Sequence, residues 1–337
     1  MSARRASAWT AVAIAGLAWS GSARADVVRL PPIASDFRAR LAGTGDGAVR
    51  AKVVDGDRQL WLRADRGATV SVAGAEGEPL LRFDRRGVFV NVRSLTAVAD
   101  RVGSVHRRVA LDPGAPPSWL RLTAGHAFLW HDHRLHALEP LAQGRGAGVV
   151  GRWGIPIRID GRQSAVRGDL VYEPAGPVWP WVLIAVVLAA AVWLGLALAR
   201  SPAHGATIGA ALAVTVVACT LRIGRELYGR PTVAGAAYAG IGVTTALGIL
   251  LLWALLQGNR DIRVFAALFA GLAALFEGLV MFRVLTHSIA LSVLPTPLAK
   301  LAVAVALGLG AGLVGIVLRG LPEAEPAVSA AALAARR

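Results

Sequence analysis

The sequence contains a single cysteine, Cys219, which lies inside an apolar stretch. One cysteine excludes an intramolecular disulfide, so an exported domain in this chain must be held together by its own hydrophobic core. The Cys-x-x-Cys, His-Glu-x-x-His, Gly-x-Ser-x-Gly and glycine-rich phosphate-loop motifs are also missing. Because no recognisable catalytic set occurs, we expect a protein that is not an enzyme.

Lysine is almost as rare as cysteine and occurs only at Lys52 and Lys300, although the formal net charge is +15. The positive charge is therefore carried by arginines, which are scattered along the chain. A nucleic-acid-binding surface needs clustered basic residues, and single-stranded nucleic acids also need aromatic residues among them. No such run occurs, and we expect no nucleic-acid partner.

Long apolar runs dominate two parts of the chain. Apolar residues make up 55% of the sequence and the mean hydropathy is +0.54, which is too apolar for one soluble globule of 337 residues. The apolar residues gather near the start of the chain and after residue 177, whereas the residues between are a normal mixture. This unevenness predicts an exported, membrane-embedded protein with a polar domain in its first half.

Residues 1–25 predict a secretory signal peptide. Arg4 and Arg5 supply its positive start, an apolar core follows, and the small residues around Ala25 predict cleavage before Asp26. The Arg4-Arg5 pair also fits a twin-arginine export signal, but the following residues lack the hydrophobic pair that such a signal usually carries. We therefore rank that alternative second.

Five membrane-spanning helices are expected after Pro177, because each apolar run is about long enough to cross a bilayer. The first run begins with Trp179 and Trp181, which suit the membrane interface. Repeated glycines in the third and fifth runs favour close helix packing, and thus a bundle. The spans are expected at Val178–Ala199, Gly205–Leu221, Val233–Leu256, Val264–Thr286 and Leu298–Leu318, and the glycines are Gly235, Gly240, Gly242, Gly308, Gly310 and Gly312.

Export of the first domain sets the expected orientation: the first span runs from outside to inside. The loop at 257–263 and the tail at 320–337 are then cytoplasmic, and the tail composition predicts disorder. The loop at 222–231 is then outside, where Arg222, Arg225 and Arg230 give the positive-inside rule only partial support. The predicted location is the plasma membrane, with several spans and with lipid as a partner.

Residues 26–177 alternate between apolar and polar side chains, with turn signals at intervals. Asp55-Gly56 and Asp160-Gly161 are typical tight turns between strands. Seven or eight short strands of this kind predict an antiparallel all-β sandwich. The runs with this alternation lie at Val49–Val53, Leu60–Leu62, Val70–Val72, Leu81–Phe83, Val88–Val92, Ile155–Ile159 and Val166–Tyr172.

Four of the seven histidines fall in one window of this domain, at His126, His131, His133 and His136. On a strand, His131 and His133 would share one face and could hold a copper or zinc ion. Asp132 could add an oxygen ligand or orient a ring, and His126 or His106 could complete the set. The alternative is structural: Asp132 pairs with Arg134, Trp130 belongs to the core, and the histidines complete a hydrogen-bond network.

A second polar set lies in the predicted membrane region, at Glu277, Arg283 and His287 of the fourth span. A carboxylate there is costly and normally faces a partner, and Arg222 and Arg225 near the second span are natural candidates. The set is either a polar pocket that serves transport or signalling, or a buried ion pair that orders the bundle.

The stretch Trp130-His131-Asp132-His133-Arg134-Leu135-His136 resembles the Trp-His-Asp-His-Arg-x-His signature of an uncharacterised, actinobacterial-type family of exported membrane proteins. This chain has Ala137-Leu138 where that family has Trp-Met, and Asp26 where many members have a histidine. The Asp-Gly turn and the following strand are weakly similar to periplasmic copper-resistance β-sandwich proteins. Further blocks resemble the family at Glu78–Phe83, Gly87–Asn91, Pro116–Trp119, Trp153–Ile157, Asp160-Gly161 and Val166–Gly168.

The sequence thus predicts a signal peptide (1–25), an extracytoplasmic β-sandwich (26–177), a transmembrane bundle (178–319) and a tail (320–337). The leading hypothesis is a membrane-tethered protein that binds copper, zinc or another transition metal through the histidine cluster. The alternatives are a small transporter or signalling module that uses the bundle, and a structural or assembly protein with a partner in the cell envelope.

Overall fold

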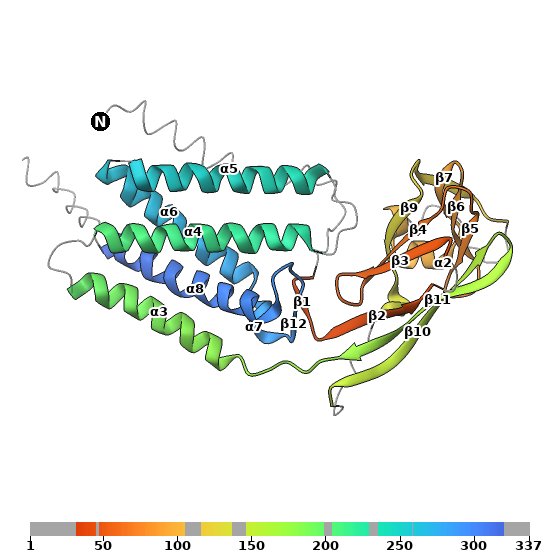
Figure 1. Cartoon of the computed structure of the whole chain (residues 1–337), viewed down its shortest axis with the longest axis horizontal. Helices are drawn as coiled ribbons and strands as arrows, with labels where there is room; N and C mark the ends of the chain where they lie inside the picture. Colours follow the sequence, from red (N-terminus) through yellow and green to blue (C-terminus); the bar gives the residue numbers. More distant parts are fainter. Residues whose placement is uncertain are drawn as a thin grey trace, which may run out of the picture. The chain divides into compact units, whose positions relative to one another are not determined.

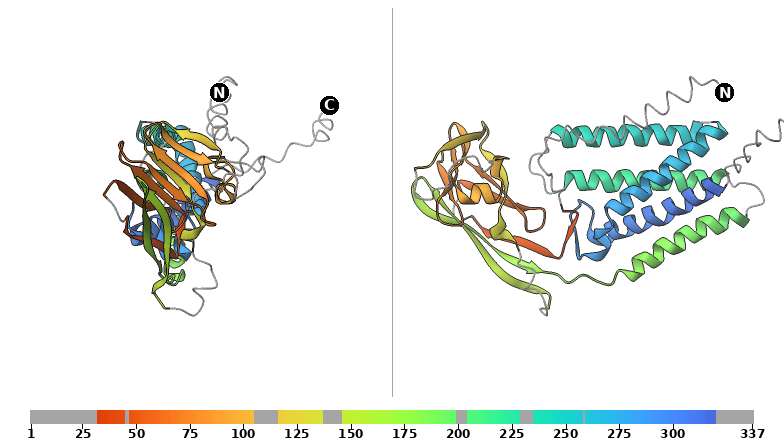
Figure 2. Two further views of the ribbon diagram at one scale, coloured as in Figure 1. Left: turned by 90° about the vertical axis from the view of Figure 1, so that its right-hand side faces the viewer. Right: turned by 180° about the vertical axis from the view of Figure 1, so that it is seen from behind.

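The computed structural model describes residues 32–44, 47–104, 116–136, 146–198, 204–228, 235–257 and 259–319. The predicted signal peptide and the predicted tail lie outside the described residues, as does His106. The described residues from Ile33 onward belong to one compact unit. Antiparallel sheets come first in this unit and helices follow (Figure 1 and Figure 2).

The β region contains two antiparallel sheets. The larger has seven strands in the order β2-β11-β10-β5-β6-β7-β8, and the smaller has three in the order β3-β4-β9. Their bounds are β2 (Phe37–Gly43), β3 (Val49–Val54), β4 (Gln59–Ala64), β5 (Val70–Ala73), β6 (Pro79–Asp84), β7 (Gly87–Asn91), β8 (Trp119–Thr123), β9 (Ala127–His131), β10 (Gly148–Ile159) and β11 (Arg162–Tyr172).

Alternation in the sequence accounts for most of these strands. In β10, Trp153, Ile155, Ile157 and Ile159 are buried and the residues between them are exposed. The turns expected at Asp55-Gly56 and Asp160-Gly161 have positive φ at both residues, from 49° at Asp160 to 82° at Gly161. This backbone matches the twist of the flanking strands, so each pair closes a hairpin.

The two sheets bury one hydrophobic core, which confirms the expected sandwich. Leu60, Leu62 and Trp130 come from the small sheet and pack with residues of the large sheet. The large sheet contributes Val70, Val72, Leu81, Phe83, Val88, Val90, Ile155, Ile157, Ile159, Val166 and Leu170.

A short helix, α2 (Leu95–Ala99), was not anticipated because it is too short to show a helical period. Ser94 caps its start: the Ser94 hydroxyl accepts a hydrogen bond from the Ala97 amide at 3.1 Å. The same hydroxyl donates to Oε1 of Glu78 at 2.7 Å, and the Thr96 amide donates to that oxygen at 3.1 Å. Glu78 therefore fixes α2 against the end of the β5–β6 hairpin.

The chain is a membrane protein. Among the described residues, four helices are long and apolar enough to cross a bilayer: α4 (His204–Leu227), α5 (Gly235–Gln257), α8 (Thr296–Arg319), and the stretch formed by α6 (Arg260–Val280) with α7 (Arg283–Thr286). The first of the five expected spans is also an apolar helix, α3 (Trp179–Leu198), but its apolar stretch, Trp179–Gly195, is shorter than those of the other four.

Glycines bring the helices of the bundle together. Helix α8 packs against α3 and α6, and α4 packs against α5 and α6 (Figure 1). A Cβ at Gly310 would lie 2.9 Å from the Gly271 carbonyl oxygen, and one at Gly308 would meet the Ala185 carbonyl. The expectation of close packing was wrong for Gly240 and Gly242, where a Cβ would meet nothing within 4 Å.

A short strand pair joins the two regions. Strand β1 (Ala34–Ser35) pairs antiparallel with β12 (Ile289–Ala290), which lies between α7 and α8. The Ser288 amide donates to Oδ1 of Asp36 at 2.7 Å, and the Leu291 amide donates to the Ile33 carbonyl at 2.9 Å. The residues that precede β2 are therefore tied to the connection into α8.

Candidate functional site

Strand β9 ends at His131, in the middle of the histidine window. Trp130 lies opposite Leu60 of β4 and is 3% exposed, so it belongs to the core as the structural alternative proposed. Asp132 then caps a turn of 3-10 helix, His133–Leu135, whose Leu135 is fully buried. The expectation that His131 and His133 share a strand face was therefore wrong, because the Asp132 cap and the burial of Leu135 turn the chain.

Asp132 is fully buried, and its carboxylate accepts four hydrogen bonds. Arg134 donates three of them, from Nε at 2.8 Å, Nη2 at 2.7 Å and its backbone amide at 3.1 Å, and Trp130 donates one from Nε1 at 3.0 Å. Burial alone would raise the pKa of Asp132, but these donors and the Arg134 charge outweigh it and hold the pKa below its usual value. With its lone pairs in use, Asp132 has a structural role and is not available as a ligand.

His133 is paired with Asp100, the residue at the end of α2. Its Nδ1 lies 3.0 Å from both carboxylate oxygens of Asp100, whose side chain is 4% exposed, whereas the His133 side chain is 47% exposed. One ligand atom from each of Asp100, Asp132 and His133 lies within 4.8 Å of the others. Because Asp132 is already saturated, this cluster offers only Asp100 and His133 to an ion.

Among the described residues, His131 and His136 form a close histidine pair. Their Nε2 atoms are 3.1 Å apart, and the ring centroids are 4.7 Å apart at an angle of 47°. Two imidazoles on one zinc ion, with Zn–N bonds of about 2.05 Å, have their nitrogens about 3.3 Å apart in a tetrahedral site and about 2.9 Å apart at a right angle. The observed spacing falls between these two values, and it is also the length of a hydrogen bond between the two rings.

A buried carboxylate faces the outer side of this pair. Oδ2 of Asp57, in the turn between β3 and β4, lies 3.6 Å from Nδ1 of His136, and Asp57 is 6% exposed. The Asp132 amide donates to the Arg58 carbonyl at 3.2 Å and ties this turn to the histidine segment. A carboxylate beside Nδ1 favours the tautomer with its proton there, so that the Nε2 lone pair of His136 faces His131 Nε2, from which it can accept a hydrogen bond when no ion is bound.

The electrostatics keep His131 neutral. Partial burial lowers its pKa most, and His136 lowers it further. Asp100 acts in the opposite direction, followed by a smaller lowering effect of Arg58 and a still smaller raising effect of Asp132. Neutral imidazole is the form that binds metal ions. His131 is therefore ready to act as a ligand at neutral pH without first losing a proton to solvent.

The structure does not gather all four histidines into one set. His126 lies in the bend before β9, and the contact described for it is its carbonyl, which accepts a hydrogen bond from the Ala64 amide at 3.0 Å. His131 and His136 form one pair, and His133 forms another with Asp100. Asp57 and Asp100 were missed in the sequence because each is far along the chain from its histidine, and no local pattern marks them.

The polar set of the helical region is also divided. Oε2 of Glu277 lies 4.0 Å from Nη1 of Arg222, whose Nη2 lies 3.9 Å from Glu226 on the same helix. Glu277 is 7% exposed, and the charge of Arg225 also acts on it. Arg222 is thus the expected partner of Glu277. Within the described residues, the buried Oε1 atom of Glu277 has no hydrogen-bond partner.

Arg283 and His287 do not join that cluster. Arg283 is exposed on α7, and His287 Nδ1 lies 2.8 Å from the Arg283 carbonyl and 3.0 Å from the Thr286 hydroxyl. The break between α6 and α7 at Met281-Phe282 moves these residues off the helix that carries Glu277.

Comparison with family models, curated proteins and solved structures finds no match to this chain.

Proposed function

We propose that this protein is a membrane-anchored binding protein whose β-sandwich captures a transition-metal ion, copper or zinc, outside the cytoplasm. The observation that carries the proposal is the 3.1 Å separation of the Nε2 atoms of His131 and His136. The pair replaces His131 and His133 as the core of the expected site. The protein is proposed to bind the ion and not to catalyse a reaction.

The surroundings support binding of a cation. Asp57 favours the tautomer of His136 that presents its Nε2 lone pair, as carboxylates do beside metal-bound histidines. The Asp132–Arg134 pair fixes the turn that places His136 beside His131. The negative charge of Asp100 reaches His131 and would lower the energy of a bound cation.

The extracytoplasmic location is part of the proposal and rests on the signal-like sequence at residues 1–25 and on the apolar helices that follow the sandwich. A protein with this layout would hold an ion at the outer surface of the membrane. The remaining ligand positions would be filled by water or by a partner protein that accepts the ion.

Isothermal titration of zinc(II), copper(II) and copper(I) into the full-length protein in detergent tests the proposal. We expect one equivalent to bind tightly, and affinity to fall by at least about tenfold in His131→Ala and in His136→Ala, because each removes one of two ligands. His126→Ala is the matched control and should bind as the wild type does. Equal affinity in all four proteins would leave the cluster with a structural role and favour the alternative of an envelope assembly protein.

A second candidate function uses the helical region. Glu277 is a buried carboxylate between apolar helices, and one of its oxygens has no partner among the described residues. Such a group is a natural binding point for a proton or cation in a transporter or signalling module. Glu277→Gln tests this candidate, with Asp261→Asn in the exposed first turn of α6 as the control. If Glu277→Gln leaves the cellular phenotype unchanged, the Glu277–Arg222 pair serves only to stabilise the packing of the helices.

A further inference from the structure

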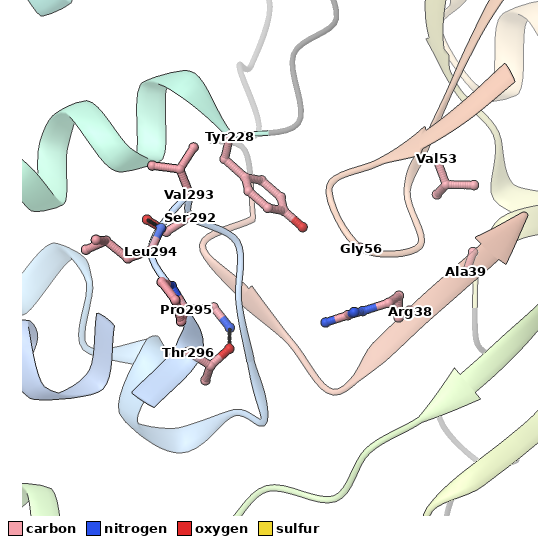
Figure 3. Close-up of a pocket in the computed structure, with 11 residues that line it drawn as sticks. Arg38, Ala39, Val53, Gly56, Tyr228, Ser292, Val293, Leu294, Pro295 and Thr296 are labelled. Carbon is pink, nitrogen blue, oxygen red and sulfur yellow. Dashed lines mark hydrogen bonds between the residues drawn. The ribbon is translucent and has the colours of Figure 1, made fainter. Parts of the chain in front are cut away.

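A cavity of about 410 Å³ lies at one end of the bundle, between strand β2 and the connection into α8 (Figure 3). Its walls include Arg38, Gly56 of the β3–β4 turn, Tyr228 after α4, and Ser292 and Thr296 before and at the start of α8. A volume of this size falls within the range of ordinary small-molecule sites, about 300–1,000 Å³. The cavity is separate from the histidine pair.

One positive charge lines the cavity. Arg38 is the one charged residue among those that line it, and the negative charge of Asp55, next to Gly56, also reaches Tyr228. The Arg38 side chain and the Tyr228 hydroxyl point toward the same space (Figure 3). In the described part of the chain no carboxylate pairs with Arg38, whereas Arg40 on the same strand pairs with Glu173 at 3.6 Å. Burial raises the pKa of the Tyr228 phenol, the Arg38 charge partly offsets the rise and the Asp55 charge adds to it, so the phenol remains a hydrogen-bond donor.

Hydrogen bonds between elements hold the walls of the cavity in place. The Ala39 amide donates to the Gly56 carbonyl at 3.0 Å, which joins β2 to the β3–β4 turn. The Val293 amide donates to the Gly224 carbonyl at 3.1 Å, and the Ala290 amide donates to the Thr296 hydroxyl at 3.1 Å. A ligand would therefore enter a site that is already formed and would not have to order it.

The cavity lies beside the ends of two candidate membrane spans, where a bilayer would have its lipid headgroups. One span ends at Leu227, immediately before Tyr228, and another begins at Thr296. Tyrosine is enriched at that level, and lipid phosphates lie there. The positive end of the α8 dipole adds to the Arg38 charge, and the exposed Val293 gives the cavity an apolar rim.

We propose that this cavity binds a phosphate group supplied by the headgroup of an anionic membrane lipid. Arg38 contributes its charge and its fork of N–H donors, and Tyr228 donates through its hydroxyl. Arginine is suited to this role because its planar guanidinium matches two phosphate oxygens at once. A lipid bound here would link the sandwich to the bundle beside the β1–β12 pair.

The test is thermal unfolding of the full-length protein in detergent, titrated with phosphatidylglycerol, with phosphatidylcholine or with inorganic phosphate. We expect phosphatidylglycerol to raise Tm with saturation, and phosphatidylcholine to raise it less. Arg38→Gln should weaken the apparent affinity for phosphatidylglycerol by about 10- to 100-fold, which is the effect of losing charged hydrogen bonds. Arg40→Gln is the control, since it removes the same charge two residues away without touching the cavity.

The outcomes separate the two sources of phosphate. If inorganic phosphate gives the same Arg38-dependent rise and the lipid adds nothing, the cavity binds phosphate from a soluble ligand. Equal responses in wild type and Arg38→Gln, or an equal loss in Arg40→Gln, would overturn the proposal. If Arg38→Gln does not fold, Tyr228→Phe serves as the test variant, because it keeps the Arg38 charge and removes only the hydroxyl donor. Unchanged affinity of Tyr228→Phe for both phosphate sources would overturn the proposal.

Discussion

Replacing Asp132 by alanine should be among the most damaging single changes in the sandwich. The carboxylate is fully buried and accepts hydrogen bonds from Arg134 and Trp130. Asp132→Ala would leave the Arg134 guanidinium, only 15% exposed, without its counter-charge, and the Trp130 indole N–H without an acceptor. Removing one partner of a buried ion pair typically costs about 3–5 kcal/mol.

Hydrogen exchange of the full-length protein in detergent, read by mass spectrometry, measures this loss. Amides of β4 and β9 that open with the sandwich should exchange roughly 10²- to 10⁴-fold faster in Asp132→Ala, because about 1.4 kcal/mol corresponds to a factor of ten. Asp169→Ala is the control: Asp169 faces Arg152 at 3.7 Å and both side chains are exposed, so the change should stay within about 1 kcal/mol. Similar exchange rates in the two variants would refute the structural role assigned to Asp132.

Three further predictions concern pH and packing. The pKa of His131 is lowered in the fold, so the stability that neutral His131 contributes is complete above pH 6.5 and is lost as pH falls through the folded-state pKa. A plot of Tm against pH should therefore be flatter in that acidic window for His131→Gln than for the wild type. Burial would raise the pKa of Glu78, but hydrogen bonds from Ser94 and Thr96 lower it overall, so the stability that ionised Glu78 contributes is lost below about pH 4.5. Glu78→Ala should destabilise the fold by about 1–3 kcal/mol and speed amide exchange in α2. Glu76→Ala, at an exposed residue of the same turn, is the control. Gly308→Ala should lower Tm in detergent, because the new methyl group would meet the Ala185 carbonyl of α3, whereas Gly315→Ala has open space and should leave Tm unchanged.

Much of the fold could be predicted because the relevant signals are local. Alternating apolar residues predicted seven strands of the sandwich, from β3 to β7 and then β10 and β11. The Asp-Gly pairs at 55–56 and 160–161 predicted two hairpins, because few residues other than glycine, asparagine and aspartate tolerate their backbone angles. The apolar runs predicted the helices, since a bilayer requires about 20 apolar residues in a row.

The site could be predicted only in part, because its geometry depends on contacts between distant residues. The histidine window was found, but the pairing within it depends on where β9 ends. That end is set by the Asp132 cap, by the burial of Leu135 and by the contact with Arg58. No sequence pattern identifies Asp57 and Asp100 as neighbours of the histidines, because a buried aspartate cannot be told from an exposed one in the sequence alone.

The polar residues of the helical region could also be predicted only in part. Desolvation predicted that Glu277 must have a partner, and Arg222 lies beside it. The sequence placed Arg283 and His287 with Glu277 by assuming one continuous helix. The break at Met281-Phe282 separates them, and no proline marks this break.

X-ray absorption at the metal edge of the full-length protein, loaded with one equivalent of zinc or copper, tests the central proposal most directly. The proposal predicts two imidazole ligands in the wild type, still two in His133→Ala, and one in His136→Ala. Loss of an imidazole in His133→Ala with both retained in His136→Ala would place the ion at the Asp100–His133 pair and contradict the assignment. Absence of any bound metal in the wild type would contradict metal capture as the function.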